Sequence, residues 1–129
     1  MGALIMVVED NPDLLLGLAL RLKSAGHTVV SAMNGDDAMP LALRERPNVI
    51  LMDIGLPGRS GHLVATELAG NAATRNIPII YLTARHEFKH RLRAAEKGAA
   101  AYLLKPCSPD HLFRTIESVL STAEPLGTN

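Results

Sequence analysis

Short runs of apolar residues recur along the chain, and longer stretches of mixed polarity separate them. The runs lie at residues 4–8, 28–32, 49–52, 79–82 and 101–104. A short apolar run without regular alternation is typical of a strand that is buried on both faces of a sheet. Each intervening stretch is long enough for the crossover helix that parallel strands require. The pattern therefore predicts an α/β fold, a five-stranded parallel sheet with right-handed crossovers and helices on both faces.

Individual residues signal the boundaries of the first two helices. Asn11 is a good helix cap, Pro12 suits the first helical position, and Gly26 favours the left-handed conformation that ends a helix. Pro40 lies inside the second helical stretch, residues 35–46, where it would remove a backbone hydrogen bond. We therefore expect the second helix to start late or to bend.

Three more helices complete an expected set of five. A third helix is expected over residues 61–69, and a fourth over residues 86–97, where the apolar stripe is thin. The last helix begins with Pro109 after the capping residue Ser108, and its apolar residues return to one face at helical spacing. We expect the fourth helix to be the least firmly packed of the five.

Composition mainly excludes classes of function. The length of 129 residues fits one domain, which we place at residues 1–121, with a C-terminal tail or linker stub at residues 122–129. Thirteen basic residues balance thirteen acidic ones, so no charge excess favours nucleic acid or a membrane surface. No apolar stretch could span a membrane, and the single cysteine, Cys107, excludes an intramolecular disulfide. We therefore expect a cytoplasmic protein with no nucleic-acid or membrane partner.

The residues that follow the apolar runs carry the candidate chemistry. Glu9 and Asp10 follow the first run, Asp53 the third, Thr83 the fourth and Lys105 the fifth. The carboxyl ends of parallel strands share one edge of the sheet, and ligands bind at this edge in open α/β folds. We therefore expect these five residues to surround one site.

Three carboxylates at one edge repel each other unless a cation or a proton offsets their charge. Oxygen ligands, without a cluster of thiolates or imidazoles, favour a hard ion, Mg²⁺. Lys105 would offer a positive charge and Thr83 a hydroxyl donor to an incoming phosphoryl group. One carboxylate would then be the nucleophile, and we assign this role to Asp53 because it ends the central strand.

Four motifs, in order and across nearly the whole chain, resemble the receiver domains of two-component response regulators. They are VVEDNPD at residues 7–13, ILMDIGLPGRSG at 50–61, YLTA at 81–84 and YLLKP at 102–106. The resemblance implies a flavodoxin-like, doubly wound sheet with strand order 2-1-3-4-5. It also implies a phosphorylation-switched signalling domain, not a conventional enzyme, in which a histidine kinase or a histidine phosphotransfer protein phosphorylates Asp53.

The same resemblance implies a metal site. Asp10 and Asp53 would bind Mg²⁺ together with the backbone carbonyl of Gly55, and Glu9 would assist, partly through water. Gly55 and Arg85 stand at two variable positions that tune the lifetime of the phosphoryl group in this family. The resemblance therefore assigns the metal ligands but leaves that lifetime open.

The resemblance also implies a route for the signal. Thr83 and Lys105 would bind the phosphoryl group, and Tyr102 matches the aromatic switch position of the family. We expect phosphorylation to draw Thr83 toward the phosphoryl oxygens and Tyr102 to fill the vacated space. The peptide bond between Lys105 and Pro106 is typically cis in this family. An output partner or a second copy of the chain would then dock on residues 86–120.

Three other interpretations compete with this one. A Mg²⁺-dependent aspartyl-phosphate hydrolase of the haloacid dehalogenase type requires a second acid two residues after Asp53, and Gly55 stands there. A flavin carrier on the same fold is disfavoured by the acidic turn at residues 9–13, which would repel a phosphate group. His86 and His90 form an H-E-x-x-H pattern, but no third zinc ligand is signalled, so we interpret the pattern as coincidence.

Overall fold

The computed structural model of the protein describes residues 2–84, 100–105 and 108–123, with the backbone alone for Thr83, Ala84 and Ala123. Five parallel strands form one sheet in the order β2-β1-β3-β4-β5. The strands are β1 Leu4–Val8, β2 Thr28–Ala32, β3 Val49–Asp53, β4 Ile79–Ala84 and β5 Ala101–Lys105. The five expected strands and their expected order are therefore confirmed.

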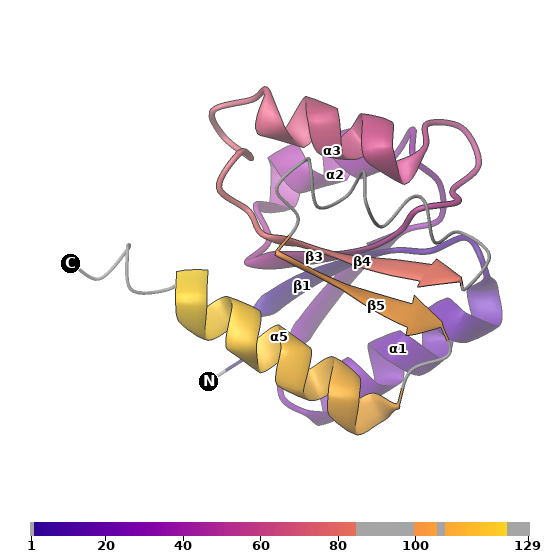
Figure 1. The fold of residues 1–129 in the computed structure, drawn as a ribbon, viewed down its shortest axis with the longest axis vertical. Helices are drawn as coiled ribbons and strands as arrows, with labels where there is room; N and C mark the ends of the chain where they lie inside the picture. The colour runs from indigo at the N-terminus through magenta and orange to yellow at the C-terminus, as the bar shows by residue number, and fades with distance from the viewer. Residues whose placement is uncertain (1, 85–99, 106–107, 124–129) are drawn as a thin grey trace.

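Helices cover both faces of the sheet (Figure 1). They are α1 Pro12–Ser24, α2 Ala38–Glu45, α3 Gly61–Ala69 and α5 Pro109–Ala123. α1 and α5 lie on one face and α2 and α3 on the other (Figure 1). These four match expected helices, whereas the expected helix at residues 86–97 lies outside the described residues.

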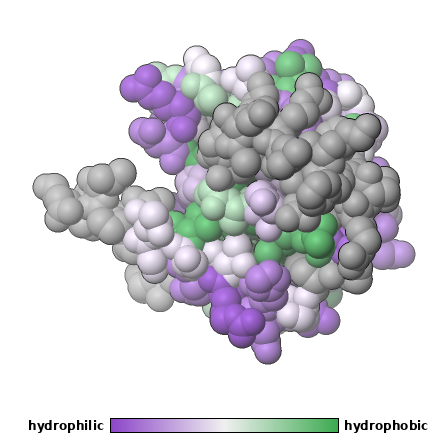
Figure 2. Space-filling model, viewed as in Figure 1, coloured by the Kyte–Doolittle hydropathy of each residue, from purple (hydrophilic) through white to green (hydrophobic). Residues whose placement is uncertain are grey.

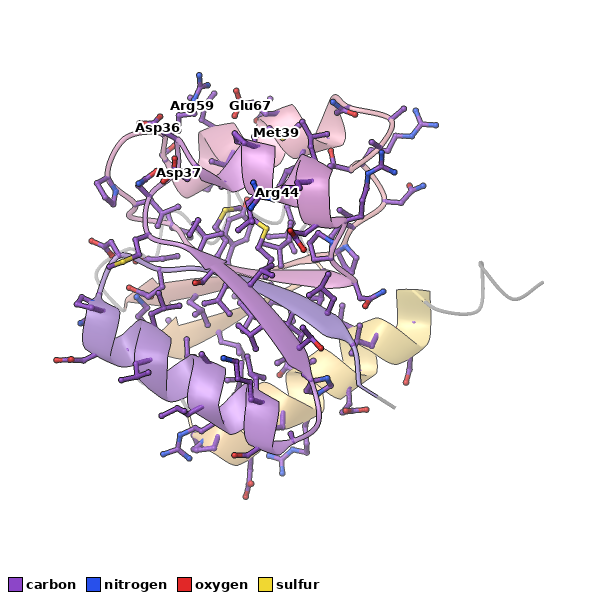
Figure 3. All side chains as sticks on the ribbon, turned by 180° about the vertical axis from the view of Figure 1, so that it is seen from behind. Asp36, Asp37, Met39, Arg44, Arg59 and Glu67 are labelled. Atoms are coloured by element: carbon purple, nitrogen blue, oxygen red, sulfur yellow. The ribbon has the colours of Figure 1, made fainter. Side chains whose placement is uncertain are left out.

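Two apolar cores fill the spaces between the sheet and its helices, as the side chains in Figure 3 show. Along β1, Ile5 and Val7 face α1 and α5, whereas Met6 and Val8 face α2 and α3. All five residues of β3 are buried, because this central strand has neighbours on both sides and helices over both faces. The buried strand carries its last residue, Asp53, to the carboxyl edge of the sheet.

The ends of the helices follow local chemistry. Asn11 caps α1 by accepting hydrogen bonds from two backbone N–H groups, and Gly26 beyond its end has a φ of 96°. α2 starts late, at Ala38, which places Pro40 in the first turn where no intrahelical donor is required. This late start was expected, but the end of α2 at Arg46, a non-glycine residue with a φ of 50°, was not.

Several expectations remain predictions because of where they fall. The bond before Pro106 and the H-E-x-x-H pattern at residues 86–90 lie outside the described residues. α5 extends to Ala123, and the expected division between a domain at residues 1–121 and a tail at residues 122–129 remains a prediction. No helix in the described parts of the chain is both long and apolar enough to cross a membrane.

Candidate functional site

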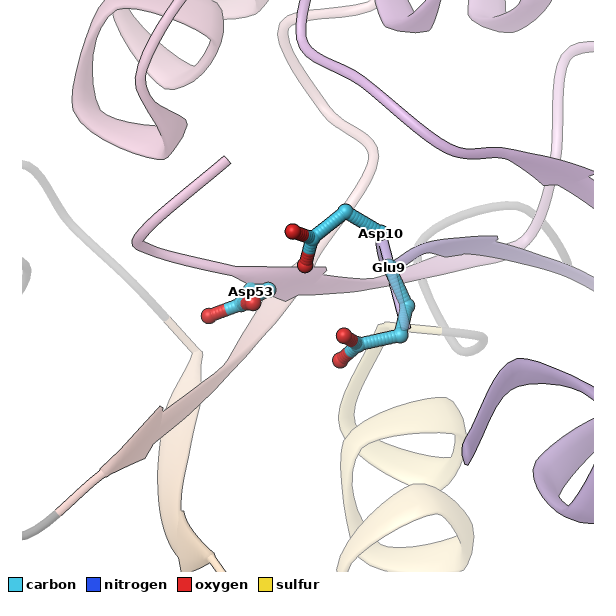
Figure 4. A group of neighbouring side chains, drawn as sticks. All are labelled: Glu9, Asp10 and Asp53. Atoms are coloured by element: carbon cyan, nitrogen blue, oxygen red, sulfur yellow. The ribbon is translucent and has the colours of Figure 1, made fainter. Parts of the chain in front are cut away.

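Three carboxylates meet at the carboxyl edge of the sheet (Figure 4). Glu9 and Asp10 directly follow β1, and Asp53 is the last residue of the neighbouring strand β3. One oxygen from each carboxylate lies within 4.8 Å of the others. Glu9 and Asp53 are buried, whereas Asp10 is exposed. The structure therefore brings together the three acids expected from the sequence.

Backbone groups orient two of these carboxylates. Oδ1 of Asp53 accepts a hydrogen bond from the N–H of Gly55 at 3.1 Å. Oε2 of Glu9 likewise accepts one from the N–H of Asn11 at 3.0 Å. Gly61, the first residue of α3, packs against the end of β3, since a Cβ there would lie 2.8 Å from the carbonyl oxygen of Asp53. A glycine at this position thus allows α3 to approach the site closely.

Lys105, the last residue of β5, joins two of the acids. Its Nζ lies 2.9 Å from Oε1 of Glu9 and 3.2 Å from Oδ2 of Asp53. Because β4 lies between β5 and the strands β3 and β1, the lysine side chain reaches across the end of β4 to contact both Asp53 and Glu9. One ammonium group thus offsets only part of the negative charge of three carboxylates.

Burial and ion pairing shift the pKa values of Glu9 and Lys105. Burial raises the pKa of Glu9 above its usual 4.5, although hydrogen bonds from Lys105 and Asn11 act in the opposite direction. Burial acts to lower the pKa of Lys105, but its hydrogen bond to Glu9 and the charge of Asp53 outweigh this effect. The pKa of Lys105 is therefore raised above its usual 10.5, and the side chain carries a positive charge at neutral pH.

The donor set fits a hard divalent cation. Each of the three clustered side chains offers carboxylate oxygen, and the cluster contains no thiolate or imidazole within the described residues. Mg²⁺ prefers such oxygen ligands and retains water in its remaining positions. The exposed Asp10 gives the cluster contact with solvent, from which an ion and its water molecules would come.

Three other expected residues are placed less completely. The backbone of Thr83 pairs with Leu104 in the parallel register of β4 and β5, but its side chain lies outside the described atoms. Tyr102 lies in β5 opposite Tyr81 and is 38% exposed. Pro106 lies outside the described residues. The structure therefore places Thr83 and Tyr102 on adjacent strands. The expected movement of these two residues on phosphorylation remains a prediction.

The sequence analysis missed one set of contacts next to the site. Arg59, in the loop after Asp53, pairs with Asp36 from the loop after β2 and with Glu67 from α3. These residues are far apart in the sequence, and ion pairs of this kind leave no periodic pattern. Only the strand order, which places β2 and β3 on either side of β1, indicates that their loops share one edge.

Comparison with known proteins decides the family. The model of the response regulator receiver domain matches residues 5–117. The chain belongs to this family. Receiver domains are the phosphorylation-switched signalling domains of two-component systems, so the hydrolase and flavin-carrier interpretations are not favoured.

Relatives and solved structures agree with this assignment. Protein PilH of Pseudomonas aeruginosa is 37% identical over 119 residues, which are 92% of this chain and 98% of PilH. The probable transcriptional regulator ycf27 of Porphyridium aerugineum is 34% identical over 125 residues, which are 97% of this chain. The match covers 51% of that regulator, so the chain spans nearly all of one relative and about half of the other.

Among solved structures, the receiver domain of the sensor histidine kinase PA1611 from Pseudomonas aeruginosa has a TM-score of 0.86 and 32% identity. The match covers 94% of this chain and 99% of that one, whose structure has a magnesium ion coordinated in the active site cleft. The chemotaxis response regulator CheY4 of Vibrio cholerae has a TM-score of 0.85 and 25% identity, over 92% of this chain and 99% of CheY4. Receiver domains from kinases and from regulators thus share this fold.

Proposed function

We propose that Asp53 receives the phosphoryl group, donated by a histidine kinase or a histidine phosphotransfer protein. The observation that carries the proposal is the 3.2 Å contact between Nζ of Lys105 and Oδ2 of Asp53 at the end of the buried central strand. Glu9 contacts the same lysine, but its side chain is 1% exposed, against 9% for Asp53. Both carboxylate oxygens of Glu9 already accept hydrogen bonds, one from Nζ of Lys105 and one from the N–H of Asn11.

The proposed reaction is a nucleophilic displacement at phosphorus. A carboxylate oxygen of Asp53 attacks the phosphorus of phosphohistidine, and the P–N bond breaks with its electron pair returning to the imidazole. The ammonium group of Lys105, held at Oδ2 by the contact above, stabilises the negative charge on the phosphoryl oxygens. Attack of water on the phosphorus of the acyl phosphate later releases inorganic phosphate and restores the carboxylate of Asp53.

We assign the proposed Mg²⁺ to Asp10, Asp53 and the backbone carbonyl of Gly55, with assistance from Glu9. When bound, the ion would neutralise charge on the acids and on the phosphoryl oxygens. The clustering of the three carboxylates supports this assignment, as does the magnesium ion in the receiver domain of PA1611.

An acetyl phosphate assay tests the phosphorylation site. We expect the wild-type protein with Mg²⁺ to gain one phosphoryl group by intact mass and the Asp53→Asn variant to gain none. Asp37→Asn removes an exposed carboxylate outside the acidic cluster and serves as the matched control, which should be labelled as wild type. Full labelling of Asp53→Asn would exclude Asp53 as the acceptor.

We further propose that the signal leaves through residues 86–120, with residues 86–97 as the remaining helix of a five-helix domain. Thr83 would move toward the phosphoryl group and Tyr102 would follow. Tyr102 lies on β5 at the front of Figure 1, and Figure 2 shows apolar surface in the middle of this face. An output partner or a second copy of the chain would bind there.

Amide NMR spectra with beryllofluoride and Mg²⁺, which mimic the phosphoryl group, test this route. We expect shifts that spread from Asp53 through Thr83 to β5 and α5 while most of α1 stays unchanged. The reason is that Thr83 can contact the phosphoryl group only in the switched conformation, so phosphorylation favours that conformation. Thr83→Ala should confine the shifts to the metal site. The same spread in Thr83→Ala would contradict the proposed switch.

A further inference from the structure

The loop after Asp53, residues 54–60, is fastened to the loop that follows β2. The N–H of Gly35 donates a hydrogen bond to the carbonyl of Pro57 at 3.0 Å. A Cβ on Gly35 would lie 1.7 Å from the carbonyl oxygen of Arg59, so only glycine fits between the two backbones. The two loops therefore meet through their main chains.

The side chain of Arg59 adds a second connection (Figure 3). Its Nε lies 3.4 Å from Oδ1 of Asp36, and its Nη1 lies 2.5 Å from Oε2 of Glu67. The guanidinium group thus joins the loop after β2 to α3, and its own loop lies between them.

The two acids that contact Arg59 have different surroundings. Gly58 has a φ of 74°, and a Cβ on it would lie 2.6 Å from Oδ2 of Asp36, so the carboxylate packs directly against the loop backbone. Oε1 of Glu67 is buried and has no hydrogen-bond partner among the described residues. Among the described residues, Arg59 is therefore the group that offsets the charge of this partly buried carboxylate.

This arrangement bears on the metal site because the same loop carries Gly55. The loop is anchored at one end by Ile54, which is buried and donates its N–H to the carbonyl of Leu82. At the other end it is anchored by Arg59 and by the Gly35–Pro57 hydrogen bond. The Gly55 backbone lies between these two anchors, next to the buried Leu56.

We propose that Arg59 is a positioning residue that holds the Gly55 carbonyl where Mg²⁺ binding requires it. The inference rests on the proposed metal site. The side chains of Arg59, Asp36 and Glu67 all remain partly exposed to solvent, so their ion pairs contribute little to folding stability. Mg²⁺, by contrast, demands a near-ideal octahedral arrangement of its ligands. Loss of the Arg59 contacts should therefore affect the metal more than the fold.

The sign of the effect separates positioning from long-range electrostatics. Arg59→Gln removes a positive charge, which by electrostatics alone would strengthen the attraction of the acidic site for Mg²⁺. Displacement of the Gly55 carbonyl would weaken binding instead. A weaker affinity in this variant thus reports on geometry.

Mg²⁺ titrations by calorimetry, together with acetyl phosphate labelling at varied Mg²⁺, test the proposal. We expect Arg59→Gln to raise the half-saturating Mg²⁺ concentration roughly three- to tenfold, less than the 10- to 100-fold typical of residues bonded directly to a metal ligand. The labelling rate at saturating Mg²⁺ should equal that of wild type. Glu67→Gln should act in the same direction, and the double variant should bind as weakly as the weaker single variant, because both changes break one connection.

Arg44→Gln is the matched control, because Arg44 forms an exposed ion pair with Glu45 at 3.1 Å and lies outside both loops. It should leave the Mg²⁺ requirement unchanged. Unchanged or tighter Mg²⁺ binding in Arg59→Gln, or additive effects in the double variant, would overturn the proposal. A wild-type protein that is labelled without binding Mg²⁺ would overturn the metal site itself, and with it any role for Arg59 in positioning.

Discussion

At the residue scale, Tyr81 is among the largest fully buried side chains, and its hydroxyl group has no hydrogen-bond partner among the described residues. Burial raises the pKa of Tyr81 to about 12 from its usual 10.0. We expect Tyr81→Phe to increase the free energy of unfolding by about 1 kcal/mol at pH 7, because it removes an unsatisfied buried group. Urea denaturation followed by circular dichroism measures this change.

The pH dependence of Tyr81→Phe follows from the same shift. Above pH 10 the unfolded wild-type chain loses the phenolic proton while the folded protein keeps it up to about pH 12, so the wild type loses stability in this interval. The advantage of Tyr81→Phe should therefore grow between pH 9 and pH 11, a range we choose to span the onset of the shift. Tyr102→Phe on the adjacent strand is the control for removing a tyrosine hydroxyl. A constant difference between Tyr81→Phe and wild type across this range would contradict the assignment.

Single residues also show what sequence can and cannot reveal. Asp53, Glu9, Asp10 and Lys105 were predictable because each lies within two residues of the end of an apolar run, and a parallel sheet brings the ends of its strands together. The sequence pattern does not reveal which carboxylate oxygen contacts the lysine. It also does not reveal that Lys105 contacts both Glu9 and Asp53, because both features depend on distances in the folded protein. The hydroxyl of Tyr81 illustrates the same limit, because a tyrosine in an apolar run looks like any other core residue.

At the element scale, two helical glycines have opposite environments. Gly17 lies inside α1, and a Cβ on it would meet no atom within 4 Å among the described residues, whereas a Cβ on Gly61 would lie 2.8 Å from the carbonyl oxygen of Asp53. Gly17→Ala should raise the free energy of unfolding by roughly 0.5–1 kcal/mol, since alanine loses less backbone entropy in a helix. Gly61→Ala should lower it and weaken phosphorylation, because α3 must move away from the end of β3.

Thermal unfolding of the two variants, compared with wild type, measures these opposite signs. Equal destabilisation by both substitutions would show that α1, like α3, requires glycine for close packing. The ends of α2 show how far single residues predict the boundaries of an element. Pro40 correctly indicated a late start for α2, but the left-handed end at Arg46 carries no glycine and left no signal.

At the scale of the whole molecule, alternation of strands and helices predicts a parallel sheet but does not determine the order of its strands. The order β2-β1-β3-β4-β5 was expected from the four motifs, since the apolar runs are too similar in length to distinguish edge from centre. Among the residues that the structure describes, β3 is the strand with every position buried, as expected for the central strand of this order. The motifs thus supplied the long-range information that the pattern lacked.

The acidic site also links metal binding to the stability of the whole domain. Folding brings oxygen atoms of three carboxylates within 4.8 Å of one another, offset by the one positive charge of Lys105, and this repulsion is absent from the unfolded chain. A ligand that binds only the folded state stabilises it by about 2.7 kcal/mol at a concentration 100 times its dissociation constant. We therefore expect Mg²⁺ at such a concentration to raise the free energy of unfolding by this amount relative to EDTA, measured by urea denaturation at pH 7.

Asp10→Asn separates this linkage from simple screening. Removing one charge from the cluster should stabilise the metal-free protein and at the same time reduce the gain from Mg²⁺, because repulsion and metal affinity have the same source. Sodium chloride at matched ionic strength screens charges without occupying a site, so it should reproduce little of the Mg²⁺ effect. An equal gain from sodium chloride, or an undiminished Mg²⁺ gain in Asp10→Asn, would show that the three acids do not form one metal site.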